Sequence, residues 1–274
     1  MGINKNQEIN PKVIEVMENL PELPSMPTVV GEALSLLDDP KTDVKQLAEV
    51  ISKDISMTTQ ILKLVNSAYY GFPQQITSIS KAMALLGFDK VRSLILSVAV
   101  KPMMMSYSGK ALWNHSIRCA VGCQHISKSL DYGDPDEAFV MGLLHDIGKT
   151  VMQIYNKKAY LEIEKLVNIG ADVLDAESTF YGFTHTEMGR ALVEKWKLPL
   201  IIGLSAQYHH NPLNSGEAVS ASIVYVADRI TQEQLKFPIF DSEIIDSFDY
   251  EVQDPEALRE EIFEHSQPII DALT

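Results

Sequence analysis

Apolar residues recur along most of the chain every three or four positions, which is the period of an amphipathic α-helix. Alternation of apolar and polar residues, which would indicate half-buried strands, is almost absent. The pattern therefore predicts an all-α protein. Expected helices cover about 11–20, 28–37, 43–52, 56–68, 78–87, 89–100, 110–130, 136–155, 158–169, 173–180, 184–196, 199–208, 217–231 and 254–266.

One stretch without helical periodicity divides these helices into two groups. Residues 101–109 are predicted to be a linker, so we expect a two-lobed helical bundle. Asp43, Ser78 and Asp254 stand where N-caps are needed, because their side chains can accept from free backbone N–H groups. We expect an N-terminal helical extension over 1–20, one domain over 21–232 and an acidic C-terminal helical extension over 233–274. The domain is expected to consist of an N-terminal lobe, about 21–101, and a C-terminal lobe, about 102–232.

Composition narrows the class of protein. A net charge of −14 over 274 residues, with no basic patch, argues against nucleic acid as a partner. The polar N-terminus has no apolar signal core, and the apolar stretch 91–105 is too short and too interrupted to span a bilayer. The two cysteines, Cys119 and Cys123, suit a reducing compartment. We therefore expect a cytoplasmic protein without a membrane segment.

The strongest chemical signal is the adjacent pair His145–Asp146 within the apolar segment 141–149. A buried carboxylate without a partner is costly, and a divalent metal is one possible partner. Imidazole and carboxylate together favour manganese, iron, nickel or zinc over calcium. If the segment is one helix, Lys149 lies one turn after His145, where it could meet a substrate anion.

Further candidates lie in apolar helices or near predicted helix ends. They are His115, His185, His209, His210 and Asp228. Each also has an ordinary interpretation. His145–Asp146 could be a hydrogen-bonded structural pair, His209–His210 could complement a helix dipole, and Asp228 could pair with an arginine. Four other side chains are interpreted as ordinary residues without a metal role: Cys119, Cys123, His125 and His265.

Taken together, these positions resemble the ligand signature of the HD superfamily of metal-dependent phosphohydrolases. The resemblance implies that His115, His145 and Asp228 hold one ion and that Asp146 bridges to a second. His185, His209 and His210 look like the second-metal ligands of the subset that includes the HD-GYP cyclic-di-GMP phosphodiesterases. Lys149 matches the lysine that contacts substrate phosphate in that group.

Three other motifs give a narrower resemblance. Residues 23–27 (LPSMP), 66–70 (NSAYY) and 76–87 (ITSISKAMALLG) are similar to the HDOD family, the "HD-related output domain", over about 20–215. The resemblance implies an all-α fold with an HD-domain-like C-terminal lobe. Most members are regarded as bacterial signalling or regulatory modules, and many lack the metal ligands.

The chain also departs from the HD-GYP pattern. No Gly-Tyr-Pro motif follows His210, and Ala111 stands where three-metal members carry glutamate. We therefore expect neither a third metal nor cyclic-di-GMP as the substrate. The pair Tyr69–Tyr70 is interpreted first as part of a structural loop and second as a partner surface.

Two functions follow from these resemblances. The first is a bacterial regulatory HDOD module with an intact dinuclear site, which binds a signalling protein or a phosphorylated small molecule or nucleotide. The alternative is an active phosphohydrolase, either a phosphomonoesterase or a nucleotide phosphodiesterase. The expected cofactors are two divalent ions, with iron, manganese or nickel favoured over zinc or magnesium. The sequence leaves the oligomeric state open.

Overall fold

The computed structural model describes residues 9–21, 25–233, 240–248, 250 and 252–274. Their regular structure is helical, with no strand among them, which confirms the predicted all-α class. The first helices are α1 (Pro11–Asn19), α2 (Thr28–Leu37), α3 (Val44–Ser52), α4 (Ile55–Val65), α5 (Ile79–Leu86) and α6 (Phe88–Tyr107). The rest are α7 (Gly109–Leu130), α8 (Pro135–Leu144), α9 (Ile147–Asn168), α10 (Val173–Tyr181), α11 (His185–Lys195), α12 (Leu200–Tyr208), the 3₁₀ turn η1 (Pro212–Asn214), α13 (Ala218–Thr231), α14 (Ser242–Ser247) and α15 (Pro255–Leu273).

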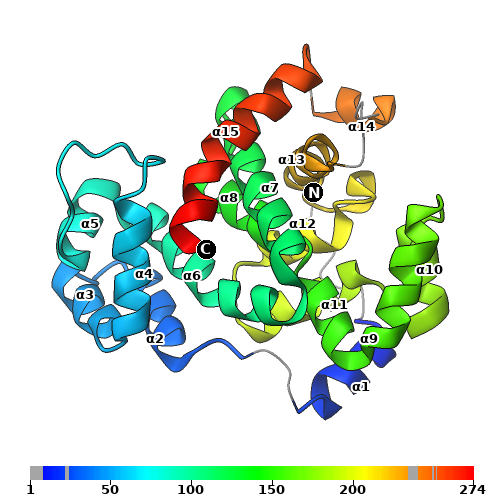
Figure 1. Ribbon diagram of the computed structural model, residues 1–274, viewed down its shortest axis with the longest axis horizontal. Helices are drawn as coiled ribbons and strands as arrows, with labels where there is room; N and C mark the ends of the chain where they lie inside the picture. The colour runs from blue at the N-terminus through cyan, green and yellow to red at the C-terminus, as the bar shows by residue number, and fades with distance from the viewer. Residues whose placement is uncertain (1–8, 22–24, 234–239, 249, 251) are drawn as a thin grey trace.

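Two lobes are visible in Figure 1, as the sequence predicted. Helices α2 to α5 form the smaller lobe, drawn in blue and cyan, and α7 to α13 form the larger one, drawn in green and yellow. Helices α6 and α15 pack against both. Helix α1 lies against α11 of the larger lobe, and the side chain of Asn10 donates to the Gly182 carbonyl at 3.1 Å. None of the described helices is long and apolar enough to cross a bilayer.

The predicted linker is wrong. Helix α6 continues through 101–107, with Pro102 inside it, and only Ser108 separates α6 from α7. An interior proline costs a helix about 3 kcal/mol. Burial of Val98, Val100 and Met104, each worth roughly 1.5–3 kcal/mol, outweighs that cost.

The helix expected over 136–155 is instead divided at the chemically important pair. Helix α8 ends at Leu144, α9 begins at Ile147, and His145–Asp146 forms the junction between them. Conversely, the break expected near 156 is a kink inside α9, where Asn156 has φ −154° and ψ 84°. The hydroxyl of Tyr181 donates to the Asn156 carbonyl at 2.7 Å, so an acceptor freed by the kink is satisfied.

The predicted caps are confirmed. Asp43 forms a capping box with Gln46, and the Ser78 side chain accepts from the backbone N–H of Lys81 at 3.2 Å. Asp254 accepts from the first turn of α15, which extends beyond its expected end near 266 to Leu273. Local polar chemistry therefore located helix starts more accurately than helix ends.

Two glycines let the helices of the larger lobe approach closely. A Cβ at Gly142 of α8 would lie 2.7 Å from the Cα of Ala120 on α7. A Cβ at Gly148 of α9 would lie only 2.0 Å from the carbonyl oxygen of His185 on α11. Because these two glycines have no side chain, α7 packs closely against α8, and α11 packs closely against α9, on either side of the α8–α9 junction.

Candidate metal centre

The predicted ligands converge in the core of the larger lobe. They come from α7, the α8–α9 junction, the start of α11, the end of α12 and α13, and they are His115, His145, Asp146, His185, His209, His210 and Asp228. Segments far apart in the sequence therefore supply one cluster. Two groups within it could each hold a metal ion: His115, His145 and Asp146, and His185, His209 and His210.

The first half of the cluster combines two imidazoles with a carboxylate from α13. Nε2 of His115 lies 3.3 Å from Nε2 of His145 and 3.1 Å from Oδ1 of Asp228. Nε2 of His145 lies 3.8 Å from the same Asp228 oxygen. These atoms all face one small volume, which is the arrangement that a shared cation requires.

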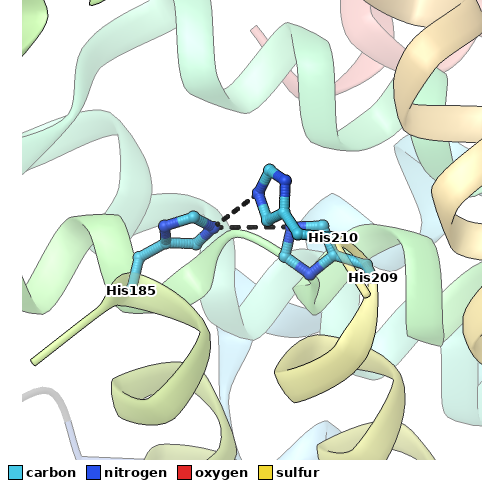
Figure 2. A group of neighbouring side chains, drawn as sticks. All are labelled: His185, His209 and His210. Carbon is cyan, nitrogen blue, oxygen red and sulfur yellow. Dashed lines mark hydrogen bonds between the residues drawn. The ribbon is translucent and has the colours of Figure 1, made fainter. Parts of the chain in front are cut away.

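The second half is made of three imidazoles. Figure 2 shows His185 from α11 facing His209 and His210, which follow α12. The Nε2 atom of His185 lies 3.4 Å from that of His209 and 3.3 Å from that of His210. These three Nε2 atoms again face a common point.

Asp146 stands between the halves. Its Oδ2 atom lies 3.4 Å from Nε2 of His145, and its Oδ1 atom lies 3.2 Å from Nε2 of His185. The side chain is 1% exposed, yet Oδ1 accepts no hydrogen bond from the described residues. A buried carboxylate oxygen without a donor is costly, so its position between two ligand groups fits a bridge between two cations.

Hydrogen bonds donated by Nδ1–H orient three of the rings. His145 Nδ1–H donates to the Gly142 carbonyl at 2.7 Å, and His209 Nδ1–H donates to the Ala206 carbonyl at 2.8 Å. His185 donates to Glu177 Oε2 at 2.7 Å. Because each Nδ1 donates in this way, Nε2 is the ring nitrogen that faces the cluster and would bind a metal.

Glu177 was not among the predicted residues. It lies on α10, is 1% exposed, and also accepts from the backbone N–H of His185 at 2.8 Å. The only signal in the sequence was a carboxylate eight positions before a candidate histidine, across a glycine-containing turn. That spacing alone does not bring two side chains together, so the pairing depends on how α10 packs beside α11.

Electrostatics keeps the carboxylates charged. Burial opposes ionisation of Asp146, but Lys149 and His145 lower its pKa well below the ordinary value. Burial also opposes ionisation of Asp228, and its hydrogen bond with His115 lowers that pKa. Carboxylates that stay ionised in a dry interior are a feature of cation-binding sites.

Two histidines are held neutral. Burial and the neighbouring His210 lower the pKa of His209 well below the ordinary value. Burial and His185 lower the pKa of His210 to about 4. Neutral imidazole is the form that binds metal, so both rings are ligand-competent at neutral pH.

Lys149 lies in a different place from the one expected. Its Nζ atom is 2.6 Å from Oδ2 of Asp146 instead of lying along the face of His145. The reason is the junction before α9, because His145 and Lys149 do not share one uninterrupted helix. Despite burial, Asp146 raises the pKa of Lys149, so the lysine is a fixed positive charge.

A cavity of about 890 Å³ opens onto the cluster. Asp146, Lys149, His115, His210 and Asp228 contribute to its lining. The second half of α9 and the start of α10 form one wall, and the start of α7 forms another. Its size falls within the range of small-molecule sites.

The ordinary interpretations have separate outcomes. Asp228 contacts His115, and its other oxygen accepts from Gln232 at 2.9 Å, while Arg229 lies over the ring of Tyr225. The expected arginine partner is therefore not the adjacent Arg229.

The cysteines are free and buried, and Cys119 is close enough to His145 to influence its pKa. The remaining histidines lie outside the cluster, since His125 and His265 contact Glu261.

Comparison with known proteins identifies the family. The family model of the HDOD domain matches residues 23–212, so the chain belongs to the HDOD family. An HDOD domain protein of unknown function from Geobacter sulfurreducens has the same fold, with a TM-score of 0.76 and 26% identity over 96% of each chain. A Shewanella amazonensis SB2B protein, provisionally assigned as a phosphohydrolase, has a TM-score of 0.78 and 24% identity, over 94% of this chain and 98% of that one.

The curated relatives are longer proteins. An uncharacterised protein of Treponema pallidum is 27% identical over 237 residues, which is 83% of this chain and 46% of that protein. The chain spans less than half the length of the curated relatives it matches. The shared region is therefore one part of those proteins.

Proposed function

We propose that this chain is a metal-dependent phosphohydrolase that serves signalling as an HDOD module. One ion would be held by His115, His145 and Asp228, and a second by His185, His209 and His210. Asp146 would bind both. The observation that carries the proposal is the buried Oδ1 atom of Asp146, which accepts no hydrogen bond within the described part of the chain and lies between the two ligand groups beside an open cavity.

The donor set suits this chemistry. Bound divalent ions would supply Lewis acidity and a water of lowered pKa. The hydrogen bonds that Nδ1–H of His145, His185 and His209 donates hold the rings in place before any ligand arrives. Iron, manganese and nickel suit such a mixture of imidazole and carboxylate better than magnesium, which prefers oxygen donors.

Basic and acidic side chains both line the cavity. The fixed ammonium of Lys149 borders the cluster, and Lys110 lines the same cavity, as do the carboxylates of Glu164, Asp172 and Glu233. The chain carries a net charge of −14, so these local cations and the two ions would have to offset a repulsive field. Burial of His145, His185 and His209 keeps bulk water away from that side of the cluster.

The experiment combines metal analysis with turnover. The purified chain is analysed for metal content, then given p-nitrophenyl phosphate and bis(p-nitrophenyl) phosphate with added manganese, iron or nickel. About two ions per chain and turnover above an Asp146→Ala control are expected. If no metal co-purifies and none can be added back, both the metal centre and the enzyme are excluded.

A second candidate is a regulatory module without catalysis. The observation that favours it is the 2.6 Å ion pair between Lys149 and Asp146, because a lysine held by the bridging carboxylate is less available to substrate. The missing Gly-Tyr-Pro motif after His210 points the same way. Its partner would be a signalling protein or a phosphorylated ligand.

The proposed location of the protein is the cytoplasm, where Cys119 and Cys123 would stay reduced. Bound metal without turnover of either substrate would favour the regulatory module over the phosphohydrolase.

A further inference from the structure

A second cavity lies where the two lobes meet, away from the metal ligands. Its volume is about 850 Å³, and it is lined by the loop between α4 and α5 and by residues of α4, α5, α6, α7, α8 and α15. None of the seven predicted ligands lines it. The proposed phosphohydrolase activity therefore assigns this cavity no role.

One wall is aromatic and held in a defined position. Tyr69, Tyr70 and Phe72 line the cavity from the loop after α4, and the rings of Tyr70 and Phe72 are within 5° of parallel. Asn66 fixes the loop at its base, because it donates to the carbonyl of Ile76 at 2.8 Å and accepts from the backbone N–H of Ile76 at 2.7 Å. A rigid aromatic wall offers flat ring faces and edges to a planar ligand.

A polar network adjoins that wall. Gln124, 8% exposed, accepts from the hydroxyl of Tyr69 at 2.7 Å and donates to Oδ1 of Asp136 at 2.9 Å. The second N–H of the Gln124 amide and the Oδ2 atom of Asp136 make no hydrogen bond within the described chain. The cavity thus offers one donor and one acceptor side by side to the polar edge of a ligand.

Two lysines add positive charge at the same place. Lys90 on α6 and Lys128 on α7 line the cavity, and both are near enough to Asp136 to oppose the rise that burial causes in its pKa. Lys128 Nζ donates to Gln124 Oε1 at 3.2 Å, which places its charge beside the polar network. Glu261 and Glu264 of α15 line the same cavity, and His125 and His265 contact Glu261.

We propose that this cavity between the lobes binds a nucleotide. The base would lie against Tyr70 and Phe72, its polar edge would meet Gln124 and Asp136, and the phosphate would meet Lys90 and Lys128. A bare phosphate would not use the aromatic wall, and an apolar ligand would leave the amide and carboxylate unpaired. A nucleotide combines the three required chemistries, namely a flat ring, donors and acceptors on its edge, and an anionic group.

Two helices connect this cavity with the ligand cluster, so nucleotide binding could affect the cluster through them. Helix α7 carries Gln124 and Lys128 near one end and His115 near the other. Helix α8 begins beside Asp136 and ends directly before His145. The two helices pack so closely that Gly142 has no room for a side chain.

The test measures nucleotide binding to the full chain without metal. The Asp146→Ala variant in EDTA, which removes the other site, is titrated with AMP and GMP by calorimetry. Adenosine, guanosine and ribose 5-phosphate serve as separate arms for the base and the anion. Saturable binding of at least one nucleotide is expected, tighter than that of its nucleoside or of ribose 5-phosphate.

Variants then locate the binding site. Lys128→Ala is expected to weaken nucleotide binding at least about tenfold and nucleoside binding little, since it removes a charge–phosphate contact. Lys81→Ala on the exposed side of α5 is the matched control and should leave affinity unchanged. Melting temperatures verify that both variants fold.

Several results would overturn the proposal. These are no binding of AMP or GMP, equal affinity for ribose 5-phosphate and the nucleotides, and equal affinity in the Lys128→Ala and Lys81→Ala variants. Binding that requires metal and intact Asp146 would assign the nucleotide to the metal centre instead. Each of these outcomes leaves the phosphohydrolase test unaffected, because turnover is measured with other substrates.

Discussion

The two halves of the ligand cluster differ in charge and access. The half built from His115, His145 and Asp228 contains its own carboxylate, and His115 is 20% exposed toward the cavity. In the other half, His185 and His209 are almost fully buried, and among the described residues that group holds no carboxylate apart from the shared Asp146. An ion in the first half would be reached by solvent and ligands, whereas one in the second would be enclosed mainly by protein.

Their proton chemistry differs as well. Burial and neighbouring imidazoles lower the pKa values of His209 and His210, whereas, against the effect of burial, Asp146 raises the pKa of His145 and Glu177 raises that of His185. The half without its own carboxylate thus combines two neutral rings with His185, which Glu177 supports from behind. Asp146 is the residue that contacts both halves, since its two oxygens lie beside His145 and His185.

The largest effect is expected from Asp146→Ala. Removing the shared carboxylate should lower metal content from about two ions per chain to well below one, because both halves lose a ligand. Elemental analysis of the purified variant measures this. His125→Ala, which removes a histidine outside the cluster, is the control. Equal metal loss in the two variants would refute the assignment.

Removing one ligand from each half separates the two ions. Asp228→Ala should reduce metal content by about one ion, and His209→Ala should do the same, while the double variant should lose both. Titration with manganese followed by electron paramagnetic resonance counts the ions bound in each case. Complete loss of metal from either single variant would show that the halves do not bind independently.

A smaller effect is expected from Glu177→Gln. Glutamine keeps the shape and can still accept from Nδ1–H of His185, but it removes the negative charge that makes the ring a better ligand. Loss of such a supporting contact typically weakens metal affinity 10–100-fold. Competition with a chelator measures the change in the His185 half. Glu187→Gln, on α11 but outside the cluster, is the control.

The smallest effect concerns pH. Burial opposes the charge on both rings, but Asp146 raises the pKa of His145, and Glu177 raises that of His185. These protons must leave before metal binds, so metal affinity should rise with pH until the pH passes the raised pKa values of the two rings. His209 and His210, already neutral, contribute no such dependence. Calorimetry in buffers of different ionisation enthalpy counts the released protons, and a count of zero would contradict this.

Much of this architecture could be predicted from local sequence. Period, caps and turn residues located most helices, and Asp43 and Ser78 cap where expected, because such signals act within a few residues. Sequence analysis also selected all seven residues of the cluster, since polar groups in apolar helices stand out. The resemblance to a known ligand pattern, more than spacing, brought them into one set.

What could not be predicted depends on contacts between distant segments. Helix α6 passes through Pro102 because its neighbours are buried, and the α8–α9 junction at His145–Asp146 has no glycine or proline to indicate it. The pairing of Glu177 with His185 and that of Lys149 with Asp146 likewise follow from packing. The spacing of these residues along the sequence does not predict either contact.

The kink at Asn156 divides α9 into parts with different stability. The first part packs against α11 beneath the ligand cluster, and its Gly148 is sealed against His185. The second part contributes Tyr160 and Ile163 to the core but exposes most of its surface, and it walls the cavity. Backbone amides of 157–168 should therefore exchange with solvent through local opening, while those of 147–155 exchange only on global unfolding. The wall of the cavity beside the ligand cluster would then open locally while the first part of α9 stays folded beneath the cluster.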